Sequence, residues 1–322
     1  MLIRASVGTL AQLGMIDLKM LEVPKTVYLL QYSPFGCLAS CTFCSQSKDS
    51  SSSKDLLSRI RWPAVELDTI IERVLQNEKK FSRLCIQSII KENFEEELLH
   101  IVRRMRKAGI SLPISLSISP VGRGFLQRAK GVGVDFIGVG LDAASPRVLA
   151  KVKKPHTWEE YWNFITDSIR VFGKRKVNVH LIFGLGEAET EFAEAMQRVY
   201  DVGAEVSLFA FTPLAGTPAE ENGRPDVIRY RIIQILRSLL SKGYQLNEVA
   251  YFEKGKVVLK QGPWLNSIRF AFLTSGCPGC NRPFYNESPA LIYNYPSVSL
   301  IEKDINVIKR QLSRAGLNPE VV

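Results

Sequence analysis

Three cysteines lie within eight residues of each other, in the stretch YSPFGCLASCTFC near the amino terminus. Cys37, Cys41 and Cys44 are spaced C-x3-C-x2-C and follow a short apolar run. A structural zinc site takes four Cys or His ligands, and no fourth stands nearby, because the histidines are at positions 100, 156 and 180. Three thiolates suit a [4Fe-4S] cluster with one iron open to an exchangeable ligand. Zinc with a distant fourth ligand is the alternative.

The other three cysteines are far apart in the sequence. Cys85 lies in the apolar stretch RLCIQS, and Cys277 and Cys280 form the motif CPGC. A lone cysteine in a strand is usually a small buried hydrophobe, and a lone CPGC is compatible with a redox dithiol or half of a zinc site. Taken together, three thiols that remain after the first site is filled predict a second, auxiliary iron-sulfur cluster.

The elements that must position these residues follow a regular alternation. Short apolar, β-branched runs alternate with longer segments of helical period, which is typical of βα repeats around a parallel sheet. The predicted strands are residues 25–32, 82–89, 112–118, 134–141, 176–183 and 204–211. The predicted helices are residues 66–79, 94–108, 122–131, 158–171, 188–202 and 226–242.

This pattern predicts an α/β fold, a full or partial TIM-type (β/α) barrel of at least six βα units, with the active site at the carboxyl ends of the strands. A doubly wound sheet is the alternative. We expect residues 1–243 to form the barrel domain with an amino-terminal extension. Residues 244–322 are expected to form a carboxy-terminal extension that carries CPGC and covers the open end.

Two local expectations accompany this fold. In the extension, EVAYFEKGKVVLKQG predicts two strands around a Lys-Gly turn, and SIRFAFLTSG predicts another strand. The serine run at residues 50–53 is polar and predicts a mobile loop.

Composition narrows the class of protein. The chain has 322 residues, 46% hydrophobic and 23% charged, with no apolar segment long enough for a membrane span. Six unevenly spaced cysteines do not resemble the disulfide framework of a small secreted domain, so a cytoplasmic protein without a membrane partner is expected. The net charge of +10 indicates either an acidic partner or a solvated, thermophile-like surface.

The first cysteine motif, with Phe43 directly before its last cysteine, resembles the signature of the radical S-adenosylmethionine (SAM) enzymes. The resemblance implies that SAM chelates the open iron of a [4Fe-4S] cluster on Cys37, Cys41 and Cys44, with Phe43 at the cofactor. An electron from that cluster then cleaves SAM to methionine and a 5′-deoxyadenosyl radical. In this interpretation the missing fourth ligand is part of the mechanism.

Further positions fit a SAM pocket. GLGE at residues 184–187 resembles the family's glycine motif after the fifth strand, which implies that Ile182 lies against the adenine; a tight strand-to-helix turn explains the same residues. Asp142 ends the fourth strand, where the carboxylate can accept both ribose hydroxyls or cap the helix that begins near Pro146.

Residues of two further segments are candidates for binding the ammonium and carboxylate groups of SAM. Gln87 and Ser88 end the second strand, where the family often has a Gly-Gly-Glu stretch that binds the ammonium. His156, with Lys153 and Lys154 beside it, is a candidate for the SAM carboxylate; a solvated loop is the alternative.

Residues 30–220 resemble the succession of segments in biotin synthase. In that resemblance Cys85 matches a ligand of the sulfur-donating cluster. The two further cysteines that biotin synthase supplies from strands three and five are absent, and CPGC takes their place. The segment CPGCNRPFYNE most resembles one component of the two-protein, archaeal-type lipoyl synthases.

That resemblance implies an enzyme with two [4Fe-4S] clusters and SAM, which inserts sulfur into an unactivated C–H bond of a protein-bound octanoyl chain. Its expected metal ligands are Cys37, Cys41, Cys44, Cys85, Cys277 and Cys280. Its expected partners are an octanoylated or monothiolated lipoyl carrier domain, a second radical SAM component and an electron donor. The local candidates for a fourth auxiliary ligand are Ser275, Asn281, Arg282 and Ser288.

Two alternatives stand beside this hypothesis. The first is another radical SAM modification, such as RNA methylthiolation, although a nucleic-acid partner is not expected, since no stripe of interleaved basic and aromatic residues is evident. The second is a non-catalytic iron-sulfur or zinc protein.

Overall fold

The structure, a computed structural model, describes residues 1–321. In this part of the chain a curved sheet of eight strands has the order β10-β9-β8-β7-β6-β2-β1-β5. Six of these strands pair in parallel, and they are β2 (Thr26–Gln31), β6 (Arg83–Gln87), β7 (Ile114–Ile118), β8 (Phe136–Asp142), β9 (Val177–Phe183) and β10 (Glu205–Ala210). Five of the six lie within the predicted ranges, and β8 extends one residue beyond its range, to Asp142.

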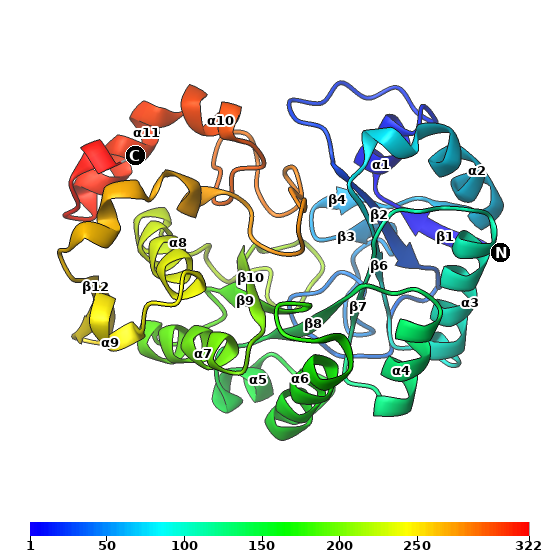
Figure 1. The fold of residues 1–322 in the computed structure, drawn as a ribbon, viewed down its shortest axis with the longest axis horizontal. Coiled ribbons are helices and arrows are strands. Elements are labelled where there is room, and N and C mark those ends of the chain that lie inside the picture. The colour runs from blue at the N-terminus through cyan, green and yellow to red at the C-terminus, as the bar shows by residue number, and fades with distance from the viewer. Residues whose placement is uncertain (322) are drawn as a thin grey trace.

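A helix follows each parallel strand and lies outside the curved sheet (Figure 1). These helices are α2 (Leu67–Asn77), α3 (Phe94–Lys107), α4 (Arg123–Gly131), α5 (Pro146–Lys151) with α6 (Trp158–Phe172), α7 (Glu189–Asp201) and α8 (Val227–Ser241). The apolar faces of these helices are buried against the strands. Several of the helices are capped at their amino termini; on α6, for example, Thr157 and Glu160 form a capping box. The structure is therefore a partial TIM-type barrel, and the doubly wound alternative is wrong.

The amino terminus completes the sheet in a way that the sequence pattern did not predict. β1 (Leu2–Ala5) pairs antiparallel with β2, and β5 (Ala64–Glu66) pairs antiparallel with β1. Arg4 is buried there and donates to the carbonyl of Trp62 at 3.0 Å. Between these strands lie α1 (Val7–Gln12) and the short hairpin of β3 (Leu56–Leu57) and β4 (Ile60–Arg61), and η1 (Glu78–Lys80) follows α2.

The carboxy-terminal part begins with α9 (Leu246–Val249) and the predicted hairpin, β11 (Ala250–Glu253) and β12 (Lys256–Leu259), around Lys254 and Gly255. The strand predicted in SIRFAFLTSG is wrong. That segment forms the 3-10 helix η3 (Arg269–Phe272), which packs on α8, and the 3-10 helix η2 (Pro263–Ser267) directly precedes it. α10 (Val298–Lys303), α11 (Ile305–Arg314) and η4 (Pro319–Val321) follow.

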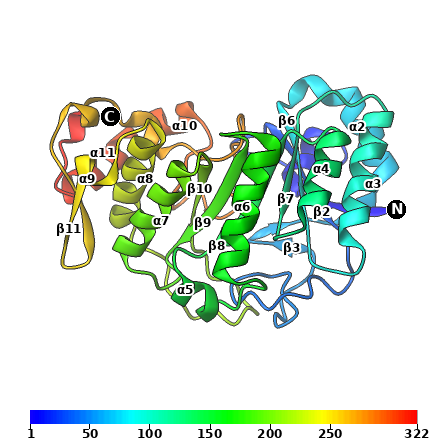
Figure 2. The same ribbon diagram turned by 60° about the horizontal axis from the view of Figure 1, so that its bottom comes forward.

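Residues 273–295 close the side of the barrel between β10, at one end of the parallel array, and β1, which pairs with β2 at the other end (Figures 1 and 2). On the β10 side, the Ser275 hydroxyl accepts from the Leu208 amide at 2.9 Å. On the other side, Tyr285 donates to Ser6 at 2.6 Å and Asn286 donates to Ser58 at 3.1 Å. The expected covering of the open barrel by the extension is therefore confirmed.

The serine run is bonded to a second loop, contrary to the expectation of a mobile segment. The amide of Ser51 and the hydroxyl of Ser50 both donate to the Gly216 carbonyl, at 2.8 and 3.0 Å, and Ser52 donates to the Ala215 carbonyl at 2.5 Å. Gly216 has φ +79° and lies so close to Ser52 that a side chain there would collide with it. Hydroxyl-to-carbonyl pairing with a distant turn is not visible in the serine pattern.

No helix within residues 1–321 is long and apolar enough to cross a membrane.

Candidate functional site

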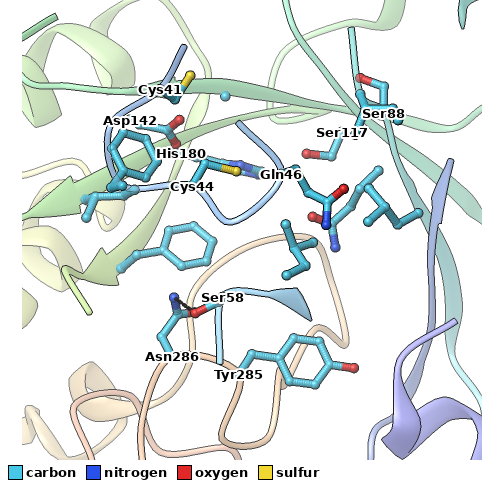
Figure 3. A pocket seen from close by; sticks show the side chains of 18 of the residues that line it. Cys41, Cys44, Gln46, Ser58, Ser88, Ser117, Asp142, His180, Tyr285 and Asn286 are labelled. Carbon is cyan, nitrogen blue, oxygen red and sulfur yellow. Dashed lines mark hydrogen bonds between the residues drawn. The ribbon is translucent and has the colours of Figure 1, made fainter. Parts of the chain in front are cut away.

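A cavity of about 290 Å³ occupies the barrel interior, and all six cysteines line it. The first trio and the CPGC motif are more than two hundred residues apart in the sequence, with Cys85 between them, and the fold brings all six cysteines to one space. Figure 3 shows Cys41 and Cys44 beside Asp142 and His180, with Tyr285 and Asn286 of the carboxy-terminal segment on another side. The apolar part of the lining comes chiefly from Leu30, Leu57, Trp62, Ile89, Phe209 and Phe211.

The loop after β2 positions the first trio. The Cys37 amide donates to the Gln46 carbonyl at 2.7 Å, and the Cys44 amide donates to the Cys41 carbonyl at 3.2 Å. Gly36 has φ +78°, and a Cβ atom there would stand 2.6 Å from the Gln46 carbonyl oxygen. Only glycine fits this position, because both the backbone conformation and the contact exclude a side chain.

Lys54 holds the same loop from its other end. Its ammonium group donates to the carbonyls of Ser45, Ser47 and Ser50 at 3.1, 2.7 and 3.0 Å. These three bonds use all the donors of the ammonium group. The cysteine loop is therefore held in one conformation by a charged group that does not itself line the cavity.

The first trio fits an iron-sulfur cluster better than a single ion. Among residues 1–321 no three His, Cys, Asp or Glu side chains stand close enough together to hold one metal ion. Zinc needs each thiolate within about 2.3 Å of one point, whereas a cluster binds each cysteine through a different iron. The Cys37 sulfur also accepts from the amides of Ala39 and Ile90, at 3.4 and 3.2 Å, which suits a thiolate.

Burial disfavours ionisation of the free thiols in this trio. It raises the pKa of Cys44 to about 12 and also raises the pKa of Cys41. Iron must supply the positive charge that turns these thiols into thiolate ligands. The donor set thus fits a [4Fe-4S] cluster with one iron left without a cysteine.

Asp142 and Lys154 form a buried ion pair next to the first trio. The Lys154 ammonium donates to the Asp142 carboxylate at 2.7 Å, and the two side chains are only 6% and 14% exposed. Burial alone would lower the pKa of Lys154, but Asp142 and Cys41 together raise it well above its ordinary value. Asp142 does not cap the next helix, because Ser145 does so by accepting from the Val148 amide.

The other residues predicted for the SAM pocket divide into two groups. Phe43, Gln87, Ser88 and Ile182 line the cavity together with Asp142 and Lys154. His156 is not among the lining residues; its Nδ1 lies 3.9 Å from the Glu160 carboxylate and its ring packs on Tyr161. Lys153 is exposed. Of the basic residues proposed for a carboxylate, the structure therefore places Lys154 in the cavity.

The GLGE turn after β9 is fixed locally. Gly184 and Gly186 have φ of +107° and +103°, and the Glu187 carboxylate accepts from the Gly184 amide at 2.5 Å. The tight-turn explanation is sufficient for these residues, while Ile182 lines the cavity just before them.

His180 also lines the cavity, and the sequence argument assigned it no role. Its ring packs edge-on against Phe209 with centroids 5.3 Å apart. Burial lowers the pKa of His180 to about 4, so the imidazole is neutral at physiological pH. The available signal was its inward position in the alternation of β9, with Asn178 and Ile182 on the same side of the strand.

The second trio forms where the CPGC turn meets the amino-terminal half of the strands. Cys85 pairs in register with Tyr28 on one side and Ser115 on the other. The CPGC turn closes with the Cys280 amide donating to the Cys277 carbonyl at 2.9 Å. Arg83 donates to the Pro278 carbonyl at 3.2 Å, which ties the turn to β6.

The cysteines of this turn contact side chains of three strands. The Cys277 sulfur lies 3.0 Å from the Asn178 amide nitrogen and 3.3 Å from the Ser115 hydroxyl, and the Cys280 sulfur lies 3.3 Å from the Tyr28 hydroxyl. Ser115 is on β7 and Asn178 is on β9. These are the third and fifth parallel strands in chain order when β2 is counted as the first. These strands therefore offer a hydroxyl and an amide to Cys277 instead of further thiols.

The four candidates for a fourth auxiliary ligand are not equivalent. Arg282 lines the cavity, whereas Ser275, Asn281 and Ser288 do not. Ser275 accepts from the Leu208 amide, and Asn281 bonds the backbone of Val23 and Lys25. The guanidinium of Arg282 packs 3.9 Å from the centre of the Phe209 ring.

The family model described as "Radical SAM superfamily" matches residues 33–199, more than half of the chain. Curated relatives include tRNA-2-methylthio-N(6)-dimethylallyladenosine synthase of Vibrio cholerae, 24% identical over 187 residues, which cover 56% of this chain and 39% of the relative. Biotin synthase of Dechloromonas aromatica is 24% identical over 213 residues, covering 63% of this chain and 61% of the relative. The matches thus span less than two thirds of these relatives.

Solved structures agree on the fold. Methylornithine synthase (PylB) superposes with a TM-score of 0.52 and 15% identity over 66% of this chain and 62% of its own. HydG, a maturase of the [FeFe]-hydrogenase, gives a TM-score of 0.52 and 10% identity, with a match that covers 66% of this chain and 49% of the HydG chain. At this identity the likeness concerns the fold alone.

Proposed function

The chain belongs to the radical SAM superfamily, and we propose that it inserts sulfur into an unactivated C–H bond of an octanoyl chain carried on a protein lysine, as one component of a lipoyl synthase. The observation that carries this proposal is the single cavity lined by both cysteine trios. Biotin synthase and the tRNA methylthiolating enzyme are relatives whose names denote sulfur-containing products. They support sulfur chemistry as the class of reaction.

A cluster held by Cys37, Cys41 and Cys44 would supply the electron for cleavage of SAM to methionine and a 5′-deoxyadenosyl radical, and a cluster held by Cys85, Cys277 and Cys280 would supply sulfide. In the overall exchange one C–H bond becomes a C–S bond. The hydrogen would leave in 5′-deoxyadenosine, the auxiliary cluster would take up the electron lost by carbon, and an external donor would supply one electron for each SAM cleaved.

The protein's own side chains bind and orient the reactants. Asp142 accepts hydrogen bonds from the ribose of SAM, and Lys154 beside it pairs with the SAM carboxylate. Gln87 and Ser88 provide polar groups at the end of β6. Phe43 and Ile182 supply apolar surface for the cofactor. The apolar lining excludes water from a carbon radical, which protects it from side reactions.

An acyl chain suits the cavity because most of its lining surface is apolar. An octanoylated or monothiolated carrier domain is the proposed substrate, with a second radical SAM component and an electron donor as further partners. Lipoyl carrier domains are commonly acidic, and the net charge of +10 would favour their docking.

Iron content tests the two-cluster arrangement. Anaerobic reconstitution should give about eight irons per chain, falling to about four in the Cys277→Ala, Cys280→Ala variant, because each trio binds one [4Fe-4S] cluster. The matched control is Ser288→Ala, in the same segment but outside the cavity, which should keep about eight. An unchanged count in the double cysteine variant would remove the second site.

A second candidate is methylthiolation of RNA, favoured by the tRNA-modifying relatives and by the basic charge. A measurement of tRNA binding distinguishes this candidate from the acyl-chain proposal. Tight retention that falls steeply with salt would favour the RNA substrate, and weak retention at moderate salt would favour the acyl carrier.

A non-catalytic cluster protein is the remaining alternative. The reconstituted protein with SAM and dithionite should release 5′-deoxyadenosine. If none forms although the first cluster is present, the enzyme proposal fails.

A further inference from the structure

Three strands of the barrel direct hydrogen-bonding side chains at the two sulfurs of the CPGC turn. Tyr28 comes from β2, Ser115 from β7 and Asn178 from β9, and all three side chains are buried. Such a sulfur-centred arrangement exceeds what is needed to hold a turn in place, because the turn is already bonded through its backbone to Arg83. The direction of each hydrogen bond tells which charge state of sulfur the site favours.

Arg83 fixes the direction at Ser115. Its guanidinium donates to the Ser115 oxygen at 2.9 Å, and a guanidinium cannot accept. The hydroxyl therefore receives one hydrogen bond and keeps its own proton, which points to the Cys277 sulfur at 3.3 Å. The positive charge of Arg83 polarises this hydroxyl and makes it a stronger donor.

A backbone amide does the same for Tyr28. The Arg282 amide donates to the Tyr28 oxygen at 3.0 Å, and this oxygen lies 3.3 Å from the Cys280 sulfur. A cysteine that ligates a cluster has no proton, so in that state the phenol is the donor. The Tyr28 ring is fixed by edge-on packing against Tyr285, with centroids 4.8 Å apart. Its hydroxyl is therefore held as a donor to sulfur.

Asn178 contributes the third donor. It is fully buried, and its amide nitrogen donates to Cys277 at 3.0 Å. Its oxygen has no partner among the described residues. An amide that leaves its acceptor unpaired in order to donate to sulfur is costly in an ordinary core, and a negatively charged sulfur would compensate that cost.

We propose that Ser115, Asn178 and Tyr28 are positioning residues that stabilise negative charge on the Cys277 and Cys280 sulfurs and thereby raise the reduction potential of the auxiliary cluster. This inference rests on the proposed function, because it needs a cluster on the second trio. Hydrogen bonds to cluster sulfurs favour the more negative, reduced state. Among the described residues no such donor contacts Cys85, so the stabilisation is concentrated on the two cysteines of the CPGC turn.

The test is a redox titration of the reconstituted full-length protein followed by electron paramagnetic resonance. The auxiliary signal is assigned by its persistence when Cys37, Cys41 and Cys44 are replaced by alanine. Ser115→Ala, Asn178→Leu and Tyr28→Phe should each shift its midpoint to lower potential, and Ser115→Ala with Asn178→Leu should shift it further than either alone. Ser115→Thr retains the hydroxyl and should restore the parental midpoint.

Ser117→Ala is the matched control, because Ser117 lies on the same strand and lines the cavity without a hydrogen bond to cysteine. Its midpoint should equal that of the parent. Unchanged midpoints in all three test variants at full iron content would overturn the inference and leave the proposed function standing.

Iron content resolves the remaining outcomes. Loss of auxiliary iron from Ser115→Ala but not from Ser115→Thr would support a role of the hydroxyl in holding the cluster, whereas equal loss from both would overturn the inference. Absence of a second cluster from the parent protein would instead refute the proposed function itself.

Discussion

Asp142 and Lys154 are buried together beside Cys41, and within the described part of the chain neither has another charged partner at hydrogen-bonding distance. Taking a lone charge out of water costs several kcal/mol, whereas a well-formed pair largely offsets that cost. Pairing therefore allows both the Asp142 carboxylate and the Lys154 ammonium to remain charged although they are buried.

Replacing Lys154 by methionine should expose this dependence. The Asp142 carboxylate would be left buried and unpaired, and the free energy of unfolding should fall by about 3–5 kcal/mol. Urea unfolding of the cluster-free protein, followed by circular dichroism, measures the loss. Asp142→Asn combined with Lys154→Met should recover most of it.

Lys153 provides the control for that substitution, because it is the exposed neighbour. Lys153→Met should change stability by no more than about 0.5 kcal/mol. Equal effects of the two lysine substitutions would contradict the assigned burial.

His180 should make stability depend on pH. Its pKa is about 4 in the folded protein and about 6.5 when unfolded. Between these values the unfolded chain binds a proton that the folded chain does not. Stability is therefore full above pH of about 6.5 and declines as pH falls toward about 4.

The loss attributed to His180 should approach, at most, about 3 kcal/mol, and water in the cavity reduces it. The pH dependence of the urea midpoint should flatten over this window in His180→Gln but not in His100→Gln, which alters an exposed residue of α3. Parallel pH profiles for the parent and His180→Gln would show that the imidazole is solvated.

At the scale of single residues, residue type and spacing identify Cys37, Cys41 and Cys44 as candidate cluster ligands, and the structure places all three in the lining of the cavity. The sequence was less informative about the residues around them. His156 and Lys154 are two residues apart in one loop, and only the path of the chain after α5 places Lys154 in the cavity. Tyr28 looks like an ordinary aromatic strand residue until the CPGC turn is placed against it.

At the level of elements, the parallel strands and their helices follow from hydrophobic period, because each βα unit buries an apolar strand beneath an amphipathic helix. The antiparallel strands β1 and β5 were missed since they are only four and three residues long. The course of residues 263–295 could not be predicted, because the hydrogen bonds that fix it include bonds to distant parts of the chain, such as those between Ser275 and Leu208 and between Tyr285 and Ser6.

Gly279 is the element-scale test of how the CPGC turn docks. It has φ +80°, and an added Cβ would lie 2.4 Å from the Ser82 hydroxyl oxygen. Gly279→Ala should push the turn away from Cys85, so that iron content falls toward about four per chain. Gly279→Ala with Ser82→Gly should recover part of the loss.

Gly243→Ala is the matched control. Gly243 also has positive φ, at +95°, but no atom lies within 4 Å of the added Cβ. This variant should bear only backbone strain, about 1 kcal/mol, and retain about eight irons. Iron loss in both variants would attribute the effect to general destabilisation.

On the scale of the whole molecule, the partial barrel depends on its carboxy-terminal segment for a closed interior. Arg231 of α8 is fully buried and bonds the carbonyls of Ile292 and Tyr293, which fastens the end of that segment. Asn286 and Tyr285 then bond the amino-terminal side. One segment thus closes the cavity and delivers two of its cysteines.

The central claim is that a radical made at the first trio takes sulfur from the second. The direct measurement is mass spectrometry of octanoyl-lysyl and monothiolated octanoyl-lysyl peptides after incubation with SAM, dithionite and protein reconstituted with isotopically heavy sulfide, with and without a partner component. We predict a peptide that has gained heavy sulfur, and no gain in the Cys277→Ala, Cys280→Ala variant. Formation of 5′-deoxyadenosine without sulfur in either peptide would contradict the account.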